Sequence, residues 1–501
     1  MCSSTENRRG WLPTAVCLGV IGACLVGEAA VLRIGIDDLD EGYFVQQAVR
    51  VLHGQVPYRD FQTLYTPGLV SLHALLFWAL GGPYVLAPRA LALGSRAALA
   101  LALYALTRPL VRHPVWAVAP SLFLLLGLDD APERWEPHPG WLSTLFAILA
   151  AWCLARDEAP RALDQLRFDT PHGRGPGGDG PRRRWLIGSG LAAGIAYLFK
   201  QNTGAFLLAA IVVWGAFSSA QRSTRVLTPL AAFCAITLAW LVPLVVVLQG
   251  QVGLLGGFVG AVNQAGLGSP AEPSIGIPLL CALGGLWLCR LGAPTRLRWY
   301  LLAGTALFGT QYPRMDTLHL AWSAPLLLVV GAVALDRLRA MAVALGVVVG
   351  AVLLIWPLPI ARLELLQQPL VPIREVRFAS DLLVPARTAA DLQGVVADIQ
   401  RQTAPGEPIF VYPTSPLLYA LAERPNPTQF DHLNPGAATP GEIQRVIADL
   451  EAQHVKLVVI SDYWQAAWGP PGPNAPLEAW LNSRFTEVAR DGAYRVLVPG
   501  L

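Results

Sequence analysis

Long apolar runs recur along most of this chain, separated by short polar segments rich in arginine. The first run, Trp11–Leu32, has 22 residues, which is enough to cross a bilayer as a helix. No small-residue cleavage site follows it, so we expect an anchor helix and not a signal peptide. Charged residues make up only 14% of the 501 residues, against about 25% in soluble domains. These features predict a polytopic α-helical membrane protein.

Arginine clusters orient the predicted spans. Arg8 and Arg9 precede the first run, which places the N-terminus in the cytoplasm and the next loop outside. As a helix, Thr66–Leu80 would be about 22 Å long, too short to span, so we expect an interfacial or re-entrant helix. With that choice, the later arginine clusters all fall on the cytoplasmic side. About 11 transmembrane helices are then expected: Trp11–Leu32, Pro88–Leu106, Val115–Leu128, Gly140–Ala155, Trp185–Phe199, Thr203–Phe217, Val226–Leu248, Ile275–Cys289, Trp299–Thr310, Leu320–Leu335 and Met341–Ile360.

From about Arg362 the composition becomes that of a soluble domain. Three runs there are typical of buried parallel strands, a fourth is a weaker strand, and two segments have a helical pattern. They are Pro408–Pro413, Val455–Ser461 and Tyr494–Pro499, then Phe485–Arg490, and the helices Ala386–Gln402 and Gly441–Gln453. We therefore expect a membrane domain over residues 1–360 and a small extracytoplasmic α/β domain over residues 361–501. The latter has no GxGxxG or P-loop motif, so nucleotide binding is not indicated.

The sequence does not support a disulfide framework, a zinc site or nucleic-acid binding. The seven cysteines have no CxxC spacing, which indicates neither a disulfide framework nor a zinc site. No basic run is interleaved with exposed aromatic residues, so nucleic acid is not an expected partner.

The first external loop, residues 33–66, carries a dense acidic cluster. Asp37, Asp38, Asp40 and Glu41 lie within five residues, and Asp60 follows in the same loop. Such acids repel each other and need water, a cation or basic partners nearby. Carboxylates at the membrane face suit general-base chemistry on a membrane-borne substrate. The alternative is a solvated loop whose acids only end or cap a helix.

Three further polar clusters are expected on the same outer side: Glu133–Pro139 (ERWEPHP), Phe199–Gln201 (FKQ) and Gln311–His319 (QYPRMDTLH). With the first loop they could place carboxylates, a lysine, an arginine and two histidines in one cavity. That set suits transfer of a group from a lipid with an anionic leaving group. Cations would hold the phosphate while a carboxylate accepts a proton from the acceptor hydroxyl. Hard divalent cations also favour clustered carboxylates, although no ligand spacing here requires a metal.

The runs DLDEGY, HGQVPYRDF, YTPGL and APRALAL resemble the GT-C glycosyltransferases that use polyprenyl-phosphate sugars. The bacterial group of protein mannosyltransferases and aminoarabinose transferases is the most similar in kind. The resemblance implies that an acid of Asp40–Glu41, with Asp38 just before the pair, is the catalytic base. It also implies interfacial helices at Tyr43–Leu52 and Thr66–Leu80. The chain departs from eukaryotic-type members, because Thr66–Pro67–Gly68 stands where they have His-Pro-Pro.

The resemblance implies an inverting glycosyltransferase in the bacterial plasma membrane. It would move a sugar from a polyprenyl-phosphate donor to a lipid, glycan or protein acceptor at the outer face. The alternative is a transporter or flippase of lipid-linked glycans. A transporter is expected to place charged or broken-helix sites near the midplane, often with internal repeats. Here the ionisable residues gather at loop edges, with Glu28 as an exception, and no repeat is visible. An inactive relative kept as a scaffold is a third reading.

The candidate site residues divide into two groups. The catalytic candidates are Asp38, Asp40 and Glu41, and those for donor phosphate or substrate are Arg59, Asp60, His138, Lys200, Arg314, Asp316 and His319. Lys200 and Arg314 are assigned to the lipid phosphate by the resemblance.

Each candidate also has a purely structural reading. Asp40 could cap the helix that follows it. Asp60 could be a turn residue paired with Arg59 or Arg50, and Arg314 could pair with Asp316. Lysines and histidines at helix ends commonly extend to the interface, cap or pack, which applies to the last three candidates, Lys200, His138 and His319.

Overall fold

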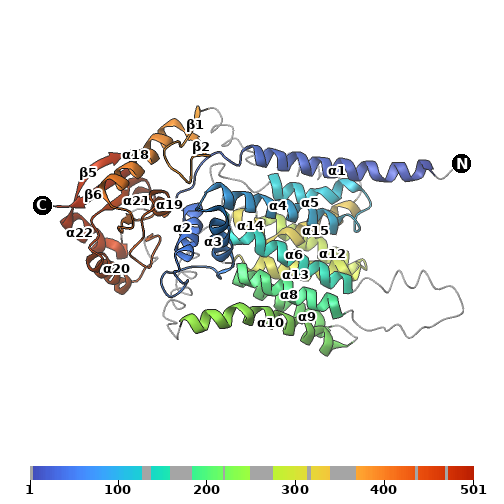
Figure 1. The fold of residues 1–501 in the computed structure, drawn as a ribbon. Helices are drawn as coiled ribbons and strands as arrows, with labels where there is room; N and C mark the ends of the chain where they lie inside the picture. The colour runs from blue at the N-terminus through green and yellow to red at the C-terminus, as the bar shows by residue number, and fades with distance from the viewer. Residues whose placement is uncertain are drawn as a thin grey trace, which may run out of the picture.

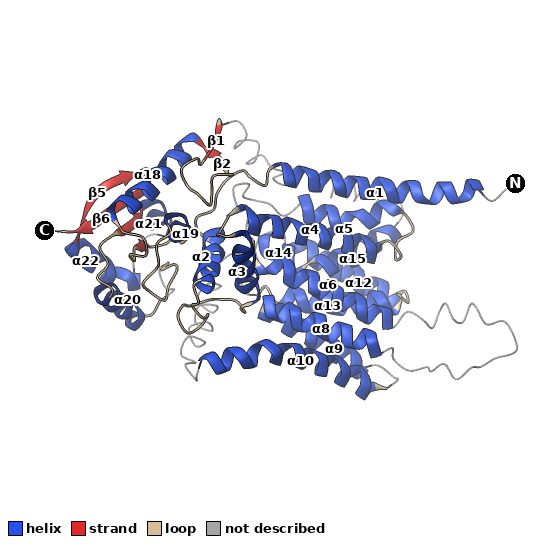
Figure 2. Cartoon of the chain, viewed as in Figure 1, coloured by secondary structure: helices blue, strands red, loops and turns tan. Residues whose placement is uncertain are grey.

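The computed structural model describes residues 4–126, 137–157, 183–217, 221–248, 275–312, 317–338, 368–434, 438–468 and 472–500. Helices of the first 338 residues form one bundle, and residues 368–500 form a smaller part at one end of it (Figure 1). Strands lie in this smaller part (Figure 2).

The bundle contains helices of very different length. Four of the described helices are long and apolar enough to cross a membrane: Leu12–Ala30, Leu86–Thr107, Pro139–Asp157 and Arg222–Leu248. The helices of the bundle are α1 (Ser4–Ala30), α4 (Leu86–Thr107), α5 (Pro114–Leu126), α6 (Pro139–Asp157), α8 (Arg183–Phe199), α9 (Gln201–Phe217), α10 (Arg222–Leu248), α12 (Gly276–Arg290), α13 (Thr295–Gly309), α14 (Thr317–Ser323) and α15 (Pro325–Arg337). The count of about 11 spans stays a prediction.

Two of the expected spans differ from the structure or cannot be compared with it. The run Leu320–Leu335 is divided between α14 and α15, and Pro325 is the first residue of α15. Proline suits a first helical position and cannot donate a backbone hydrogen bond to a preceding turn, so the run breaks there. Met341–Ile360 lies outside the described residues.

The segment between α1 and α4 folds into α2 (Asp40–Leu52) and α3 (Gly68–Leu80), which confirms a helix in both predicted segments. Both run across the direction of α1 at the end of the bundle that faces residues 368–500 (Figure 1). Gly81, in a left-handed conformation, ends α3. The acidic cluster therefore lies between the bundle and the C-terminal part.

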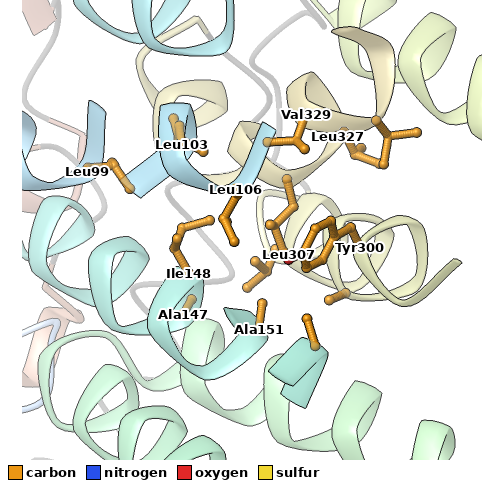
Figure 3. Packing of buried hydrophobic residues seen from close by; sticks show 14 of the residues in the cluster. Leu99, Leu103, Leu106, Ala147, Ile148, Ala151, Tyr300, Leu307, Leu327 and Val329 are labelled. Carbon is orange, nitrogen blue, oxygen red and sulfur yellow. The ribbon is translucent and has the colours of Figure 1, made fainter. Parts of the chain in front are cut away.

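The bundle core is formed by apolar side chains from α4, α6, α13 and α15 (Figure 3). Leu99 and Leu103 face Ala147 and Ile148, while Leu307 lies across the same cluster. Small residues such as Ala147 let helix backbones approach closely, which is how membrane helices gain contact area.

The C-terminal part contains a four-stranded sheet with strand order β3-β4-β6-β5 and a separate two-stranded ribbon. Its elements are β1 (Leu370–Pro372), β2 (Leu383–Pro385), α18 (Ala386–Gln402), β3 (Phe410–Tyr412), α19 (Leu417–Ala422), α20 (Pro440–Ala452), β4 (Val458–Ser461), α21 (Asp462–Trp468), the 3-10 helix η2 (Gly472–Asn474), α22 (Ala475–Arg484), β5 (Phe485–Asp491) and β6 (Tyr494–Pro499). All four predicted strand segments form strands, and both predicted helices form.

The direction of one strand differs from the expectation. β3 and β4 are parallel, but β6 runs antiparallel to β4. Only Gly492 and Ala493 connect β5 to β6, so these two strands are antiparallel to each other, and β6 lies between β5 and β4.

The C-terminal part packs directly on α2 and α3. One hydrophobic cluster contains Val45 and Phe77 from these helices together with Ile373 and Val384. A Cβ at Gly42 would lie 2.7 Å from the backbone nitrogen of Leu417, so the absent side chain lets α2 approach α19. The helix that carries the acidic cluster is thus fixed from both sides.

Candidate active site

Asp37 lies three residues before α2 and binds the backbone at its start. Its Oδ1 accepts hydrogen bonds from the backbone N–H groups of Leu39 at 3.0 Å and Asp40 at 3.2 Å. Asp40 is itself the first residue of α2 and does not cap it; the N-cap residue is Leu39, and Asp37 binds the backbone next to it. Burial, followed by the charges of Asp40, Asp38 and Glu41, raises the pKa of Asp37 to about 8. A protonated Asp37 removes one negative charge from the cluster at neutral pH.

Glu41 is fully buried in an ion pair with Arg89 of α4. Nε and Nη2 of Arg89 lie 2.6 and 2.7 Å from the two carboxylate oxygens. The same guanidinium donates to the backbone carbonyls of Leu32 and Gly35, each at 3.0 Å. Burial raises the pKa of Glu41, and Arg89 opposes that rise. Both carboxylate oxygens are therefore occupied in holding the start of α2 against α4 and the end of the first span.

Asp38 binds side chains of the C-terminal part. Its Oδ2 accepts hydrogen bonds from the hydroxyl of Tyr494, at 2.8 Å, and from that of Ser415. Its Oδ1 accepts one from the indole N–H of Trp464 at 3.2 Å. Burial and then the Asp38 charge raise the pKa of Tyr494, so this hydroxyl stays a donor. Asp38 is thus a point of attachment for the C-terminal part.

Asp40 is the first residue of α2 and is half-buried. Among the described residues its carboxylate accepts no hydrogen bond and forms no ion pair, in contrast to Asp38 and Glu41. The partial positive charge at a helix N-terminus favours an anion at this position. Phe44, one turn later on the same face, lies 5.7 Å from the rings of both Tyr65 and His138. Phe44 therefore joins this turn of α2 to the next group of side chains, and Asp40 shares its face of the helix.

His138 is held in one orientation and one tautomer. Its Nδ1 accepts the backbone N–H of Gly140 at 2.9 Å, which leaves Nε2 as the donor to the Tyr65 hydroxyl at 2.8 Å. The imidazole stacks on Trp322, with ring centroids 3.7 Å apart. A Cβ at Gly140 would overlap the Trp322 indole, so only glycine allows this stacking. His138 therefore binds the backbone at the start of α6, as the structural reading expected, and also holds the Tyr65 hydroxyl.

Lys200 and His319 meet the same tryptophan. The Lys200 side chain is buried, and its Nζ lies 4.5 Å from the centre of the Trp322 ring. The His319 ring centroid lies 5.1 Å from that of Trp322. Lys200 lies between α8 and α9, where Gln201 donates to the Leu64 carbonyl at 3.2 Å. Segments that are 135 residues apart in sequence, around Thr66 and Gln201, are therefore in contact.

Asp60 and Arg59 form a separate ion pair in the turn after α2. Asp60 pairs with Arg59, with Nη2 and Oδ2 2.7 Å apart, and accepts the Val56 backbone N–H at 2.7 Å. This is the turn role considered for it, and the Arg59 guanidinium lowers the pKa of Asp60. Arg314 and Asp316 lie outside the described residues.

Four residues near the site were not identified from the sequence as candidates: Tyr65, Arg89, Trp322 and His432. Arg89 had a usable signal, because a charged residue within an apolar run usually has a specific partner. His432 lies against Tyr43, with ring centroids 5.0 Å apart. Burial lowers the pKa of His432, and the charges of Asp431 and Asp40 oppose that shift. Trp322 and His432 carry no such signal, because only the tertiary fold brings them to the first loop.

A metal site does not follow from the described side chains. Within the ranges given above, no three His, Cys, Asp or Glu side chains converge so as to hold an ion. Glu133, Glu136 and Asp316 lie outside those ranges.

Comparison with known proteins identifies the fold. No protein-family model and no curated protein matches the sequence. Among solved structures, ArnT from Cupriavidus metallidurans in the apo state matches with a TM-score of 0.55 at 16% identity, over 99% of this chain and 98% of that chain. ArnT bound to undecaprenyl phosphate matches with a TM-score of 0.54 at 16% identity, over 97% and 98%. The archaeal oligosaccharyltransferase AglB from Archaeoglobus fulgidus, in complex with an inhibitory peptide and a dolichol-phosphate, gives 0.53 at 14% identity, over 97% and 74%. The chain has the GT-C fold of these membrane proteins.

Proposed function

We propose that this protein is an integral membrane glycosyltransferase that moves a sugar from a polyprenyl-phosphate donor to an acceptor at the outer face of the bacterial plasma membrane. Residues 1–360 would form the membrane domain with a cytoplasmic N-terminus, and residues 361–501 would lie outside. The fold shared with ArnT supports this proposal, as does the undecaprenyl phosphate bound to that protein. The acceptor would be a lipid, a glycan or a protein.

The observation that carries the proposal is the different use of neighbouring acids. Asp37 binds the backbone at the start of α2, Asp38 binds the C-terminal part and Glu41 pairs with Arg89. Asp40 alone of these four leaves its carboxylate without a described partner, at a helix N-terminus that favours its charge. A general base needs such a carboxylate, because a base held in an ion pair accepts a proton less readily.

The proposed reaction is a single displacement with inversion. Asp40 accepts the proton of the acceptor hydroxyl as that oxygen attacks the anomeric carbon. The bond from the anomeric carbon to the phosphate oxygen breaks, and its electron pair leaves with the polyprenyl phosphate. Lys200, buried near Trp322, would stabilise the charge that develops on the departing phosphate.

Asp38 and Glu41 act, on this proposal, by positioning. Their contacts fix both ends of the Asp37–Glu41 segment, so that Asp40 has one orientation. Asp60 is assigned a structural role in its turn, and His138, through its hydrogen bond to Tyr65, shapes the wall of the site.

Transfer of radiolabelled sugar from polyprenyl-phosphate donors, measured with the purified protein in proteoliposomes, tests the proposal. Asp40→Asn should lower the rate about 10²- to 10⁴-fold, the usual contribution of a general base. The matched control is Asp381→Asn, which changes an exposed aspartate in a surface ion pair with Arg33. It should keep wild-type activity.

Equal transfer by wild type and Asp40→Asn would exclude Asp40 as the base. If the wild-type protein transfers no sugar from any donor tested but moves lipid-linked glycans across the bilayer, the transporter reading replaces the enzyme.

A further inference from the structure

A second site lies on the other face of α2, away from the group around Trp322. A cavity of about 640 Å³ opens between α2, the end of α3 and the C-terminal part. Its walls include Gln46 and Arg50 from α2, Trp78 from α3, and Phe378 and Arg424 from the C-terminal part. The volume is within the range of about 300–1,000 Å³ typical of small-molecule sites.

Helical periodicity separates this cavity from the candidate active site. Asp40, Tyr43, Phe44 and Gln47 follow i, i+3, i+4, i+7 spacing on one face of α2. Gln46, Val49, Arg50 and His53 repeat that spacing six residues further on, and all four line the cavity. Six residues turn an α-helix by about 240° beyond one full turn, so the two faces point in different directions.

Gln46 has an unused hydrogen-bonding group in this wall. The residue is only 2% exposed, and its amide oxygen has no hydrogen-bond partner among the described residues. A buried amide oxygen without a hydrogen-bond donor is unfavourable. A ligand with hydroxyl groups would supply the missing donor.

The cavity has an excess of positive charge. Arg50 forms an ion pair of 2.8 Å with Asp431, and Arg377 forms a long ion pair of 4.0 Å with Glu423. The buried Arg424 donates only to neutral oxygens, those of Thr403, Ala422 and the Glu423 backbone. The charge of Arg424 also acts on Glu407, which pairs with Lys456 at 2.8 Å. Four cationic groups therefore stand against three carboxylates, and the positive charge in excess favours an anionic ligand.

One side of the cavity continues into an apolar surface. Leu75, Trp78 and Leu80 of α3 are exposed, and Trp78, at 71% exposure, also lines the cavity. α3 crosses the bundle end where a membrane interface is expected, and tryptophan is enriched at that level (Figure 1). A ligand here would have both an anionic polar head and an apolar chain.

We propose that this cavity binds the head group of an anionic glycerophospholipid. The phosphate lies near Arg377 and Arg424, a head-group hydroxyl donates to Gln46, and the acyl chains follow Leu75 and Trp78. The site is separate from the proposed donor site and does not depend on the function of Asp40.

Native mass spectrometry of the detergent-solubilised full-length protein, titrated with defined lipids, tests the proposal. The wild type should bind dioleoylphosphatidylglycerol at least tenfold more tightly than dioleoylphosphatidylcholine. Arg377→Glu should abolish this preference. Arg445→Glu is the matched control, because Arg445 is an equally exposed arginine, 3.6 Å from Glu442, on the surface of α20. It should bind as the wild type does.

Three results would overturn the proposal. These are equal affinity for the two lipids, an unchanged preference in Arg377→Glu, and equal affinity for glycerophosphoglycerol, the deacylated head group. The last would indicate a site for soluble phosphate esters. A Trp78→Ala variant gives an independent check, since it should weaken binding of the lipid and not of the deacylated head group.

Discussion

Arg89 holds both carboxylate oxygens of Glu41, at 2.6 and 2.7 Å, in a pair from which solvent is excluded. Glu41 is the residue after Asp40, and its pair with Arg89 joins α2 to α4 at the expected membrane interface. Sequentially adjacent acids thus have opposite roles: one is neutralised by an arginine to fix the backbone, and the other keeps its carboxylate available. If Asp40 is the base, as we propose, this neighbour orients it, which is what a preorganised site requires.

Loss of one partner from this pair should destabilise the protein strongly. Arg89→Ala leaves the Glu41 charge buried and unpaired, which costs about 3–5 kcal/mol. Arg89→Lys keeps the charge but cannot reproduce the two parallel hydrogen bonds, so an intermediate loss is expected. Thermal unfolding in detergent measures both. Arg484→Ala is the control, because it breaks the exposed pair with Glu451, worth about 0–1 kcal/mol. Equal unfolding midpoints for Arg89→Ala and Arg484→Ala would refute a structural role for the buried pair.

Removal of the Tyr494 hydroxyl should loosen the attachment of the C-terminal part to the acidic cluster. Tyr494→Phe deletes a hydrogen bond of 2.8 Å to the Asp38 carboxylate, and bonds to charged groups contribute about 1.5–3 kcal/mol. We expect faster amide hydrogen exchange in residues 36–44, together with lower thermal stability. Tyr463→Phe, which changes an exposed tyrosine, should leave both quantities unchanged. Wild-type exchange rates in Tyr494→Phe would show that Asp38 is not a point of attachment.

Much of the organisation could be predicted from local sequence patterns. A helix at Tyr43–Leu52 follows from its apolar spacing, and one at Thr66–Leu80 from an apolar run that is too short to span a membrane. The break before Pro325 was missed because it depends on a single residue within an apolar run. The direction of β6 was missed because the apolar pattern of a buried strand does not say which way the strand runs beside its neighbour.

The site was only partly predictable for a different reason. The acidic cluster is visible in the sequence, but the division of roles within it is set by residues that are far away along the chain. Arg89 is 48 positions from Glu41, and Tyr494 is 456 positions from Asp38. No local pattern encodes which of four adjacent acids finds such a partner.

The protonation of Asp37 should give the stability of the protein a specific pH dependence. Burial raises the pKa of Asp37 to about 8, whereas the unfolded value is about 4. The folded state therefore binds this proton more tightly. The stabilising contribution is complete below about pH 4 and declines as the pH rises toward 8, by at most about 1.4 kcal/mol per pH unit.

Asp37→Asn should remove that decline. The asparagine amide oxygen can still accept hydrogen bonds from the N–H groups of Leu39 and Asp40, so both hydrogen bonds are kept. Thermal unfolding at pH 5, 6, 7 and 8 should show a smaller fall for Asp37→Asn than for the wild type. Asp381→Asn should follow the wild type. Parallel curves for the wild type and Asp37→Asn would show that Asp37 is ionised in the folded protein.

Lys200 and Lys456 are the two lysines of this chain, which permits a direct test of the proposed phosphate contact. Lys200 is buried beside Trp322, whereas Lys456 lies on the surface in an ion pair of 2.8 Å with Glu407. If Lys200 stabilises the departing phosphate, Lys200→Gln should lower kcat/KM for the donor roughly 10- to 100-fold, because loss of a contact to a charged group costs about 1.5–3 kcal/mol. It should also weaken inhibition by free polyprenyl phosphate to a similar degree, which a merely destabilised protein would not do. Lys456→Gln should leave both constants at wild-type values. Lower activity of Lys200→Gln with unchanged inhibition by polyprenyl phosphate would assign Lys200 to packing against Trp322 and remove it from the phosphate site.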